Sequence, residues 1–318
     1  MKKFAGLFLA LCLILTFSIA AAEETAEKAP IVHTSGDYEY ILLPDGTAEI
    51  TQYWGKTTEL TIPSALDDYI VTGIGEEAFF MRRDYLTSIN IPDSVISIGN
   101  LAFYGCKSLT SITIPDSVTH MGSNPFKYCE NLKEIYVSPD HPTLATIDGV
   151  LFDKTEKKLI CYPCAFSAKS YSIPHGIRAI GDDAFFYCNS LTSISIPDSV
   201  TSIGDEVFAY CISLKSITIP NSATSIGDNA FYFCASLASI SIPDSVTSIG
   251  EMAFNKCSFL TDITIPNSVI NIGENAFIDC SENLILTVGR DSYARQYAID
   301  NKLKYTYPDA NALDWLNN

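Results

Sequence analysis

Hydrophobic and polar positions along this chain follow a 23-residue pattern, which recurs block after block from Leu191 onward. Three consecutive blocks read LTSISIPDSVTSIGDEVFAYCIS, LKSITIPNSATSIGDNAFYFCAS and LASISIPDSVTSIGEMAFNKCSF, and a fourth follows from Leu260. The same frame begins earlier at Leu86 and Leu109. Repetition at this period is typical of a solenoid, in which each block buries its apolar face only by stacking on its neighbours.

The first half of each block has the alternation of a short β-strand. In the block from Leu191, Ile194 and Ile196 are expected to point inward, while Ser193 and Ser195 point outward. Proline then ends the strand, and the Asp-Ser pair that follows is typical of a turn. We therefore predict one main strand per block.

The second half of the block predicts a turn and a short helical segment. Val200 and Ile203 form a second inward pair, and Gly204 is expected to turn the chain. Asp205 is then placed to cap a helical turn, whose core-facing residues are predicted to be Val207, Phe208 and Cys211. Eight inward positions per block cannot close a core alone, so we expect stacked blocks to share one continuous interior.

The recurring segments IPxSV, IGxxAF and a final Cys resemble the BspA-type leucine-rich repeats of bacterial surface proteins. The resemblance implies an α/β repeat solenoid, a right-handed curved superhelix with one main strand per repeat. It further implies an N-terminal linker and β-hairpin cap over 23–59, a repeat array over 60–287, and a helix-and-strand cap with a tail over 288–318. For function it implies a non-enzymatic protein that binds other proteins, including host matrix or surface proteins.

One unit departs from the period. The unit that opens at Leu132 runs for 36 residues before the frame resumes at Ala168, an excess of 13. We expect the excess to form a hairpin insertion over about 139–166, similar to insertions in the same family. It either divides the array into two stacks as a spacer or helps to shape a binding surface.

The N-terminus and the charge balance indicate where the chain works. Lys2 and Lys3 precede an apolar run over 4–19 and three alanines, which predicts a signal peptide cleaved after Ala22 and a secreted or cell-surface protein. Apart from this run, no segment has the roughly 20 apolar residues of a membrane span, so no membrane insertion is expected after cleavage. The net charge of −17 argues against nucleic acid as a partner.

Two surfaces are candidates for binding a protein ligand. Most outward strand positions are serine or threonine, so Glu134, Tyr136 and Asp262 stand out as contact residues on that face. A second surface follows each repeat phenylalanine, where aromatic residues recur at Phe186, Tyr187, Tyr210, Tyr232 and Phe233, with Tyr104 and Tyr128 as outliers in the earlier blocks. The alternative for this second set is a structural, half-buried position.

The cysteines raise a different possibility. Seven of the ten hold one repeat position beside the phenylalanines, where we expect buried free thiols, although isolated pairing stays open. Cys161 and Cys164 form a CxxC in the insertion, which leaves a thiol-redox function as an alternative. Zinc would need two further ligands, and the recurrent carboxylates are as well explained by turns and caps as by a calcium column.

No GxSxG, HExxH or phosphate-binding glycine loop occurs, and the four histidines are scattered. We therefore expect no catalytic residues, no cofactor and no metal. A structural cell-surface spacer that binds no ligand remains the second alternative to a protein-binding role.

Overall fold

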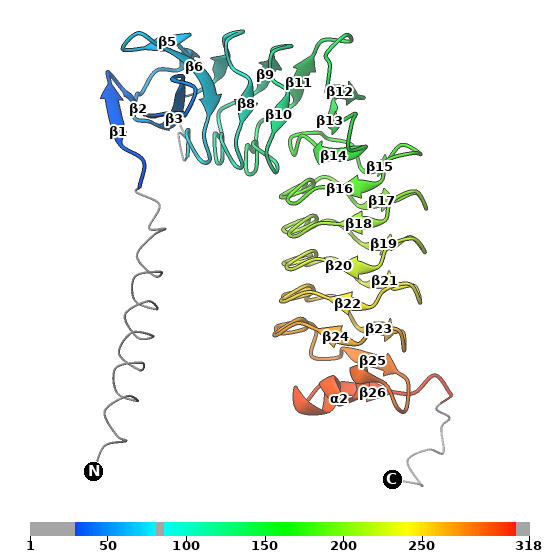
Figure 1. The fold of residues 1–318 in the computed structure, drawn as a ribbon. Helices are drawn as coiled ribbons and strands as arrows, with labels where there is room; N and C mark the ends of the chain where they lie inside the picture. Colours follow the sequence, from blue (N-terminus) through cyan, green and yellow to red (C-terminus); the bar gives the residue numbers. More distant parts are fainter. Residues whose placement is uncertain (1–28, 81–85, 310–318) are drawn as a thin grey trace, which may run out of the picture.

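The computed structural model describes residues 29–80 and 86–309. They form two stacks of solenoid coils, whose strands pair in parallel from one coil to the next, and the stacks join at a bend (Figure 1). The first stack runs from the N-terminal strands to β11 (Glu134–Val137), and the second from β15 (Ser170–Ser172) to the C-terminal cap. The predicted signal peptide over 1–22 lies outside the described residues.

Each repeat has the one main strand that was predicted and adds a second strand, usually of two residues, on a different face of the solenoid. In the repeat from Leu191, the main strand β17 (Ser193–Ser195) is followed by the two-residue strand β18 (Ser202–Ile203). Equivalent residues pair in parallel register, as Ile194 does with Ile217 of the next repeat. The predicted outward serines and inward Ile194 are confirmed by their burial pattern, whereas Ile196 is only half-buried.

The main strands of the first stack are β4 (Glu59–Thr61), β7 (Ser88–Asn90), β9 (Ser111–Ile114) and β11. Those of the second are β15, β17, β19 (Ser216–Thr218), β21 (Ser239–Ser241), β23 (Asp262–Ile265) and β25 (Ile285–Val288). The short second-face strands are β6 (Tyr69–Ile74), β8 (Ser97–Ile98), β10 (His120–Met121), β16 (Ala179–Ile180), β18, β20 (Ser225–Ile226), β22 (Ser248–Ile249) and β24 (Asn271–Ile272).

The segment expected to be a helical turn has no helix. Glu206 and Tyr210 both take left-handed backbone conformations, with φ of 53° and 61°, which a continuing right-handed helix excludes. Instead, the amide of Phe208 donates to the carbonyl of Ala230 in the next repeat at 2.8 Å, and this pattern recurs. The label α/β is therefore wrong for the repeats, because the only helix within 29–80 and 86–309 is α2 (Tyr293–Asp300) in the C-terminal cap.

Asp205 joins repeats instead of capping its own turn. Its side-chain oxygen accepts a hydrogen bond from the amide of Asp228, one repeat later, at 2.7 Å. The amide of Asp205 in turn donates to Asp182 at 3.0 Å. This column of carboxylates satisfies backbone amides between repeats, so it needs no calcium ion to explain it.

Two aromatic ladders occupy the interior. Phe185, Phe208, Phe231, Phe254 and Phe277 are fully or almost fully buried, with neighbouring rings 5.2–5.4 Å apart. An equivalent ladder of Tyr53, Phe79, Phe103 and Phe126 fills the first stack. The expected burial of the core-facing turn residues is confirmed, but the single continuous interior is not, because the buried residues form two clusters, one for each stack.

The repeat cysteines form a further ladder as free thiols, as expected. Most of these thiols donate to the backbone carbonyl of the ladder phenylalanine in the preceding repeat. Examples are Cys211 to Phe185 at 3.1 Å and Cys234 to Phe208 at 3.0 Å. Each of these carbonyls also accepts a backbone amide, as Phe185 does from Cys188 at 3.2 Å, so the weak thiol donor adds a second hydrogen bond to the same buried oxygen. No disulfide joins any of the cysteines that the structure describes.

The insertion forms a small sheet that lies between the two cores and packs against both. Its strands β12 (Leu144–Ile147), β13 (Val150–Asp153) and β14 (Lys158–Cys161) pair antiparallel, and β14 then pairs parallel with β16. Leu151 and Ile160 pack in the core of the first stack, whereas Val150 and Leu159 pack in that of the second. The array is thereby divided into two stacks, which is the spacer role expected of the hairpin.

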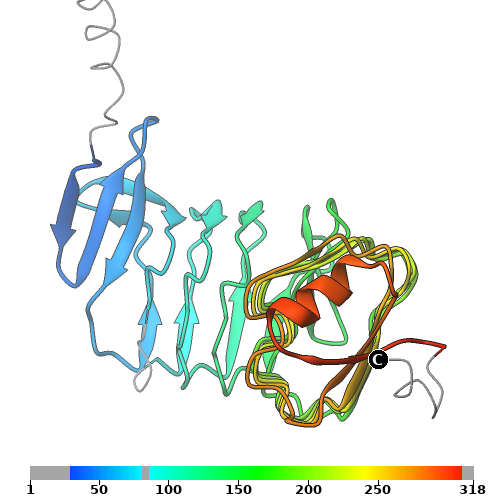
Figure 2. The ribbon, with the colours of Figure 1, turned by 90° about the horizontal axis from the view of Figure 1, so that it is seen from below.

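Antiparallel and helical elements cover the two ends. Strands β1 (Val32–Ser35), β2 (Tyr38–Leu42) and β3 (Ala48–Tyr53) form an antiparallel set, and β3 pairs parallel with β6, which also pairs with β5 (Ala65–Leu66). At the other end, α2 lies across the last repeat and β26 (Lys304–Thr306) extends the main sheet (Figure 2). Tyr297 of α2 contacts Phe277, the last ring of the ladder.

Candidate functional site

The outward residues of the main strands are exposed, as predicted, but they do not form one surface. Glu134 and Tyr136 lie on β11, the last main strand of the first stack, whereas Asp262 lies on β23 in a separate sheet. Tyr136 is 52% exposed, and its hydroxyl donates to Glu134. It borders a hollow of about 490 Å³ that also includes Asn90, Thr113 and Asp116. The structure therefore groups Glu134 with Tyr136 and leaves Asp262 apart.

The aromatic residues that follow the ladder phenylalanines form a continuous surface strip. Its members, here called the aromatic strip, are Phe80, Tyr104, Tyr128, Phe186, Tyr187, Tyr210, Tyr232 and Phe233. All five residues predicted for this surface belong to it. Tyr104 and Tyr128 are part of the same strip rather than outliers, because Tyr128 reaches across the bend to Tyr187 with ring centroids 4.9 Å apart.

The strip lies on the turn segments, which face the inside of the bend in both stacks (Figure 1). Its rings are only partly covered: Phe186 is buried, Phe233 is 37% exposed, and the tyrosines lie between these limits. The tyrosines are half-buried, as the structural alternative expects, and Phe186 is more deeply buried still, while Phe233 and part of each tyrosine ring remain exposed for contact. A concave line of rings that spans two arms is suited to contacting one partner with both arms.

Ion pairs accompany the strip across the bend. Lys127, from the first stack, contacts Asp183 at 2.7 Å and Glu206 at 2.9 Å in the second. Its Nζ atom also lies 4.5 Å from the ring centroid of Phe186. Burial raises the pKa of Asp183 to about 6, although Lys127 opposes that rise. Asn124 adds a hydrogen bond to the carbonyl of Asp183 at 2.7 Å, so the bend is held by several polar contacts.

The CxxC has no features of a redox centre. Cys161 is buried, and Cys164 donates to the carbonyl of Cys129 at 3.1 Å while it packs against the core of the second stack. Burial raises the pKa of Cys164 to about 12 and that of Cys161 well above its usual value. Tyr162, between them, stacks on Phe185 at 5.2 Å. The motif is therefore a shortened repeat turn, with Tyr162 in the place of the ladder phenylalanine.

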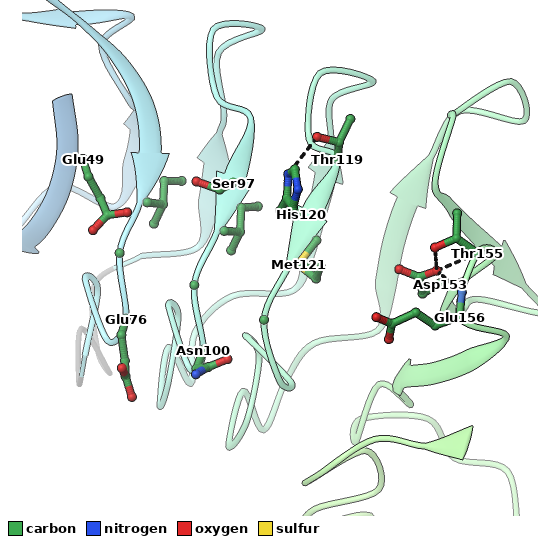
Figure 3. Close-up of a pocket in the computed structure, with 15 residues that line it drawn as sticks. Glu49, Glu76, Ser97, Asn100, Thr119, His120, Met121, Asp153, Thr155 and Glu156 are labelled. Atoms are coloured by element: carbon green, nitrogen blue, oxygen red, sulfur yellow. Dashed lines mark hydrogen bonds between the residues drawn. The ribbon is translucent and has the colours of Figure 1, made fainter. Parts of the chain in front are cut away.

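A hollow of about 590 Å³ lies between the second-face strands of the first stack and the turn after β13 (Figure 3). Four carboxylates line it, those of Glu49, Glu76, Asp153 and Glu156, together with His120. Burial raises the pKa of Glu49. Within the described ranges, no group of three or more His, Cys, Asp or Glu side chains is arranged to hold a metal ion. These residues come from the N-terminal cap, from different repeats and from the insertion, so no sequence pattern pointed to them.

The profile of the BspA type leucine rich repeat region matches residues 48–168 and 157–285, in six copies. The chain belongs to this family. BspA-type repeats therefore account for both stacks and for the insertion between them. No helix in the part of the chain that the structure describes is long and apolar enough to cross a bilayer.

Solved structures show the same fold. A leucine rich cell surface protein from Faecalibacterium prausnitzii is 28% identical, with a TM-score of 0.55 over 86% of this chain and 98% of that one. The pneumococcal vaccine antigen PcpA is 19% identical, with a TM-score of 0.54 over 89% of this chain and all of that one, a likeness of fold alone. A search of curated proteins finds no match.

Proposed function

We propose that this BspA-type protein is an exported, non-enzymatic adhesion module, which binds a protein ligand on the inside of its bend. The supporting observation is the aromatic strip, a line of partly exposed rings that is continuous between the two arms. Exposed aromatic side chains are enriched at protein interfaces, whereas the serine-rich strand faces offer few such anchors. The cell-surface description of the Faecalibacterium protein supports a similar location here.

The hollow beside Tyr136 is the second candidate surface for the same function. Tyr136 is the one large aromatic side chain on the described main-strand face of the first stack, and it is more exposed than Phe233. Because it lies on a different face from the strip, the two surfaces can be tested independently.

Binding of the full chain to immobilised matrix proteins and glycans, measured by biolayer interferometry, tests the proposal. Two variants locate the site: Tyr187→Ser with Tyr210→Ser removes two rings of the strip, and Tyr136→Ser removes the ring of the strand face. Both should keep the fold, because these side chains lie outside the buried cores. Deleting the insertion is unsuitable, since it would remove the sheet that both cores share.

We expect a protein in the panel to bind the wild type and to lose at least tenfold in affinity with the strip variant, as for removal of interface anchors. Loss with Tyr136→Ser alone would place the site on the strand face. A wild type that binds nothing in the panel would favour the ligand-free spacer.

A further inference from the structure

The strip contains aromatic rings at backbone positions that disfavour them. Tyr128, Tyr187, Tyr210 and Phe233 all occupy the second position after a ladder phenylalanine and have φ between 57° and 65°. Bulky residues avoid this left-handed conformation, which glycine adopts freely. Glycine is present at the same position in an earlier repeat, at Gly105, and polar residues follow in later ones, at Lys256 and Asp279. The rings are therefore confined to the repeats around the bend and are not required by the repeat itself.

The rings change orientation at the bend. In the first stack Phe80 and Tyr104 lie nearly parallel, with an interplanar angle of 10°, so each covers a face of the other. Across the bend Tyr128 meets Tyr187 at 79°, and Tyr210 meets Tyr232 at 68°. Tyr187 has edge-to-face and tilted neighbours among the described residues, whereas one face of Tyr210 stacks on Phe233 at an interplanar angle of 28°. The faces of Tyr187 and the other face of Tyr210 therefore have no stacked neighbour in this part of the chain and are open to a ligand.

Lysine side chains of the protein itself already lie over other rings of the strip. Lys107 lies 4.2 Å from the centroid of Tyr128, and Lys127 lies 4.5 Å from that of Phe186. Lys256 lies 5.4 Å from the centroid of Tyr232. Such distances are typical of cation–π contacts. No cation from the described ranges lies over Tyr187 or Tyr210, at the centre of the strip.

Carboxylates flank the rings of Tyr187 and Tyr210. Burial raises the pKa of both phenols, and the charges of Glu130 near Tyr187 and of Glu206 near Tyr210 add to the rise. Lys107 contacts one oxygen of Glu130, and Lys127 contacts one oxygen of Glu206. The second oxygen of each carboxylate remains to accept a further donor. A net charge of −17 adds a field that draws in basic partners.

We propose that the centre of the strip, at Tyr187 and Tyr210, binds an arginine side chain carried by an extended segment of a basic protein. This inference rests on the proposed protein-binding function and specifies its partner. A planar guanidinium stacks on an aromatic face while it donates to a carboxylate, as Glu130 and Glu206 would allow. An ammonium group lacks the plane and the paired donors, so arginine is favoured over lysine.

Fluorescence polarisation with the full chain and three labelled peptides tests this assignment. The peptides alternate glycine with arginine, with lysine, or with citrulline, which keeps the shape of arginine without its charge. The wild type should bind the arginine peptide most tightly and the citrulline peptide least, with affinity that falls as salt rises. Equal affinity for all three would overturn the proposal.

Two variants and one control separate ring and charge contributions. Tyr210→Gly removes a ring without adding backbone strain, and we expect binding of the arginine peptide to weaken about tenfold. Glu206→Gln should weaken it several-fold and reduce its salt dependence. Tyr293→Leu, at an exposed tyrosine of α2, should leave binding unchanged.

Circular dichroism confirms the fold of each variant before binding is compared. Unchanged affinity in a folded Tyr210→Gly protein would exclude this site. If a matrix protein needs the strip but the arginine peptide binds no better than the others, the arginine assignment fails and the proposed function stands. A strip that binds a glycan of the panel and none of the peptides would identify the ligand as a carbohydrate and would also overturn the assignment.

Discussion

Substitution of Gly227 by alanine should separate two neighbouring repeats. A Cβ atom at Gly227 would lie 2.3 Å from the carbonyl oxygen of Gly204 and 2.6 Å from its carbon, where ordinary contact begins at 3.4 Å. The repeats must therefore move apart by about 1 Å, which strains the bond from Asp228 to Asp205 and that from Glu206 to Asp228. Each bond contributes about 1 kcal/mol and overpacking costs about 1–3 kcal/mol, so we expect a loss of about 3–5 kcal/mol.

Gly176→Ala is the matched control, because its problem is conformation rather than space. Gly176 has φ of +91°, and a Cβ atom there would meet nothing within 4 Å, so alanine should lose only about 1–2 kcal/mol. Urea unfolding followed by circular dichroism gives both free energies. A Gly227→Ala protein that is no less stable than Gly176→Ala would refute the claim that the backbones stack this closely.

Three further predictions address the thiols, the ion pair at the bend and the insertion. Iodoacetamide at pH 8 should leave Cys161 and Cys164 unmodified in the native protein and label both in urea, as mass spectrometry would show; rapid native labelling would revive the redox alternative. The pKa of Asp183 is about 6 in the folded protein, against an ordinary 3.8. The folded protein therefore binds this proton more tightly than the unfolded chain, and the free energy of unfolding should fall by about 2–3 kcal/mol as the pH rises from 4 through 6. Urea titrations at several pH values should show this slope in the wild type and not in Asp183→Asn. Tyr162→Phe should stabilise the protein by about 1 kcal/mol, because the buried hydroxyl of Tyr162 has no hydrogen-bond partner; a lower urea midpoint would show that the hydroxyl is satisfied.

The sequence pattern predicted the inward and outward positions well because alternation and period follow directly from side-chain burial. Val207, Phe208 and Cys211 are buried as expected, and Ser193 and Ser195 are exposed. The helical turn was wrong because three inward residues at helical spacing fit equally well on a chain of turns. Only backbone dihedrals distinguish the two, and neither Glu206 nor Tyr210 is a residue type that signals a left-handed conformation.

The sequence predicted the second-stack members of the strip, but it missed Phe80, set Tyr104 and Tyr128 apart as outliers, and did not show that the strip is continuous. The recurrence of aromatic residues after each ladder phenylalanine pointed to Phe186, Tyr187 and Tyr210. Their junction with Tyr128 depends on how the two stacks meet, which the lengths of the repeats do not determine. The ion pair of Lys127 with Asp183 joins residues 56 positions apart in sequence, and nothing in either repeat marks them as partners.

The hairpin shared by the two cores also affects how folding propagates from one stack to the other. A nucleus formed within either arm grows by adding one neighbour at a time, since each repeat contacts mainly the next. At the hairpin this growth meets a sheet whose opposite surfaces belong to different arms, through Leu151 on one side and Phe152 on the other. When one arm has folded, its side of the hairpin sheet is in place, and the other side is then a preformed surface on which the first repeat of the second arm can pack. The hairpin therefore couples the folding of the two arms.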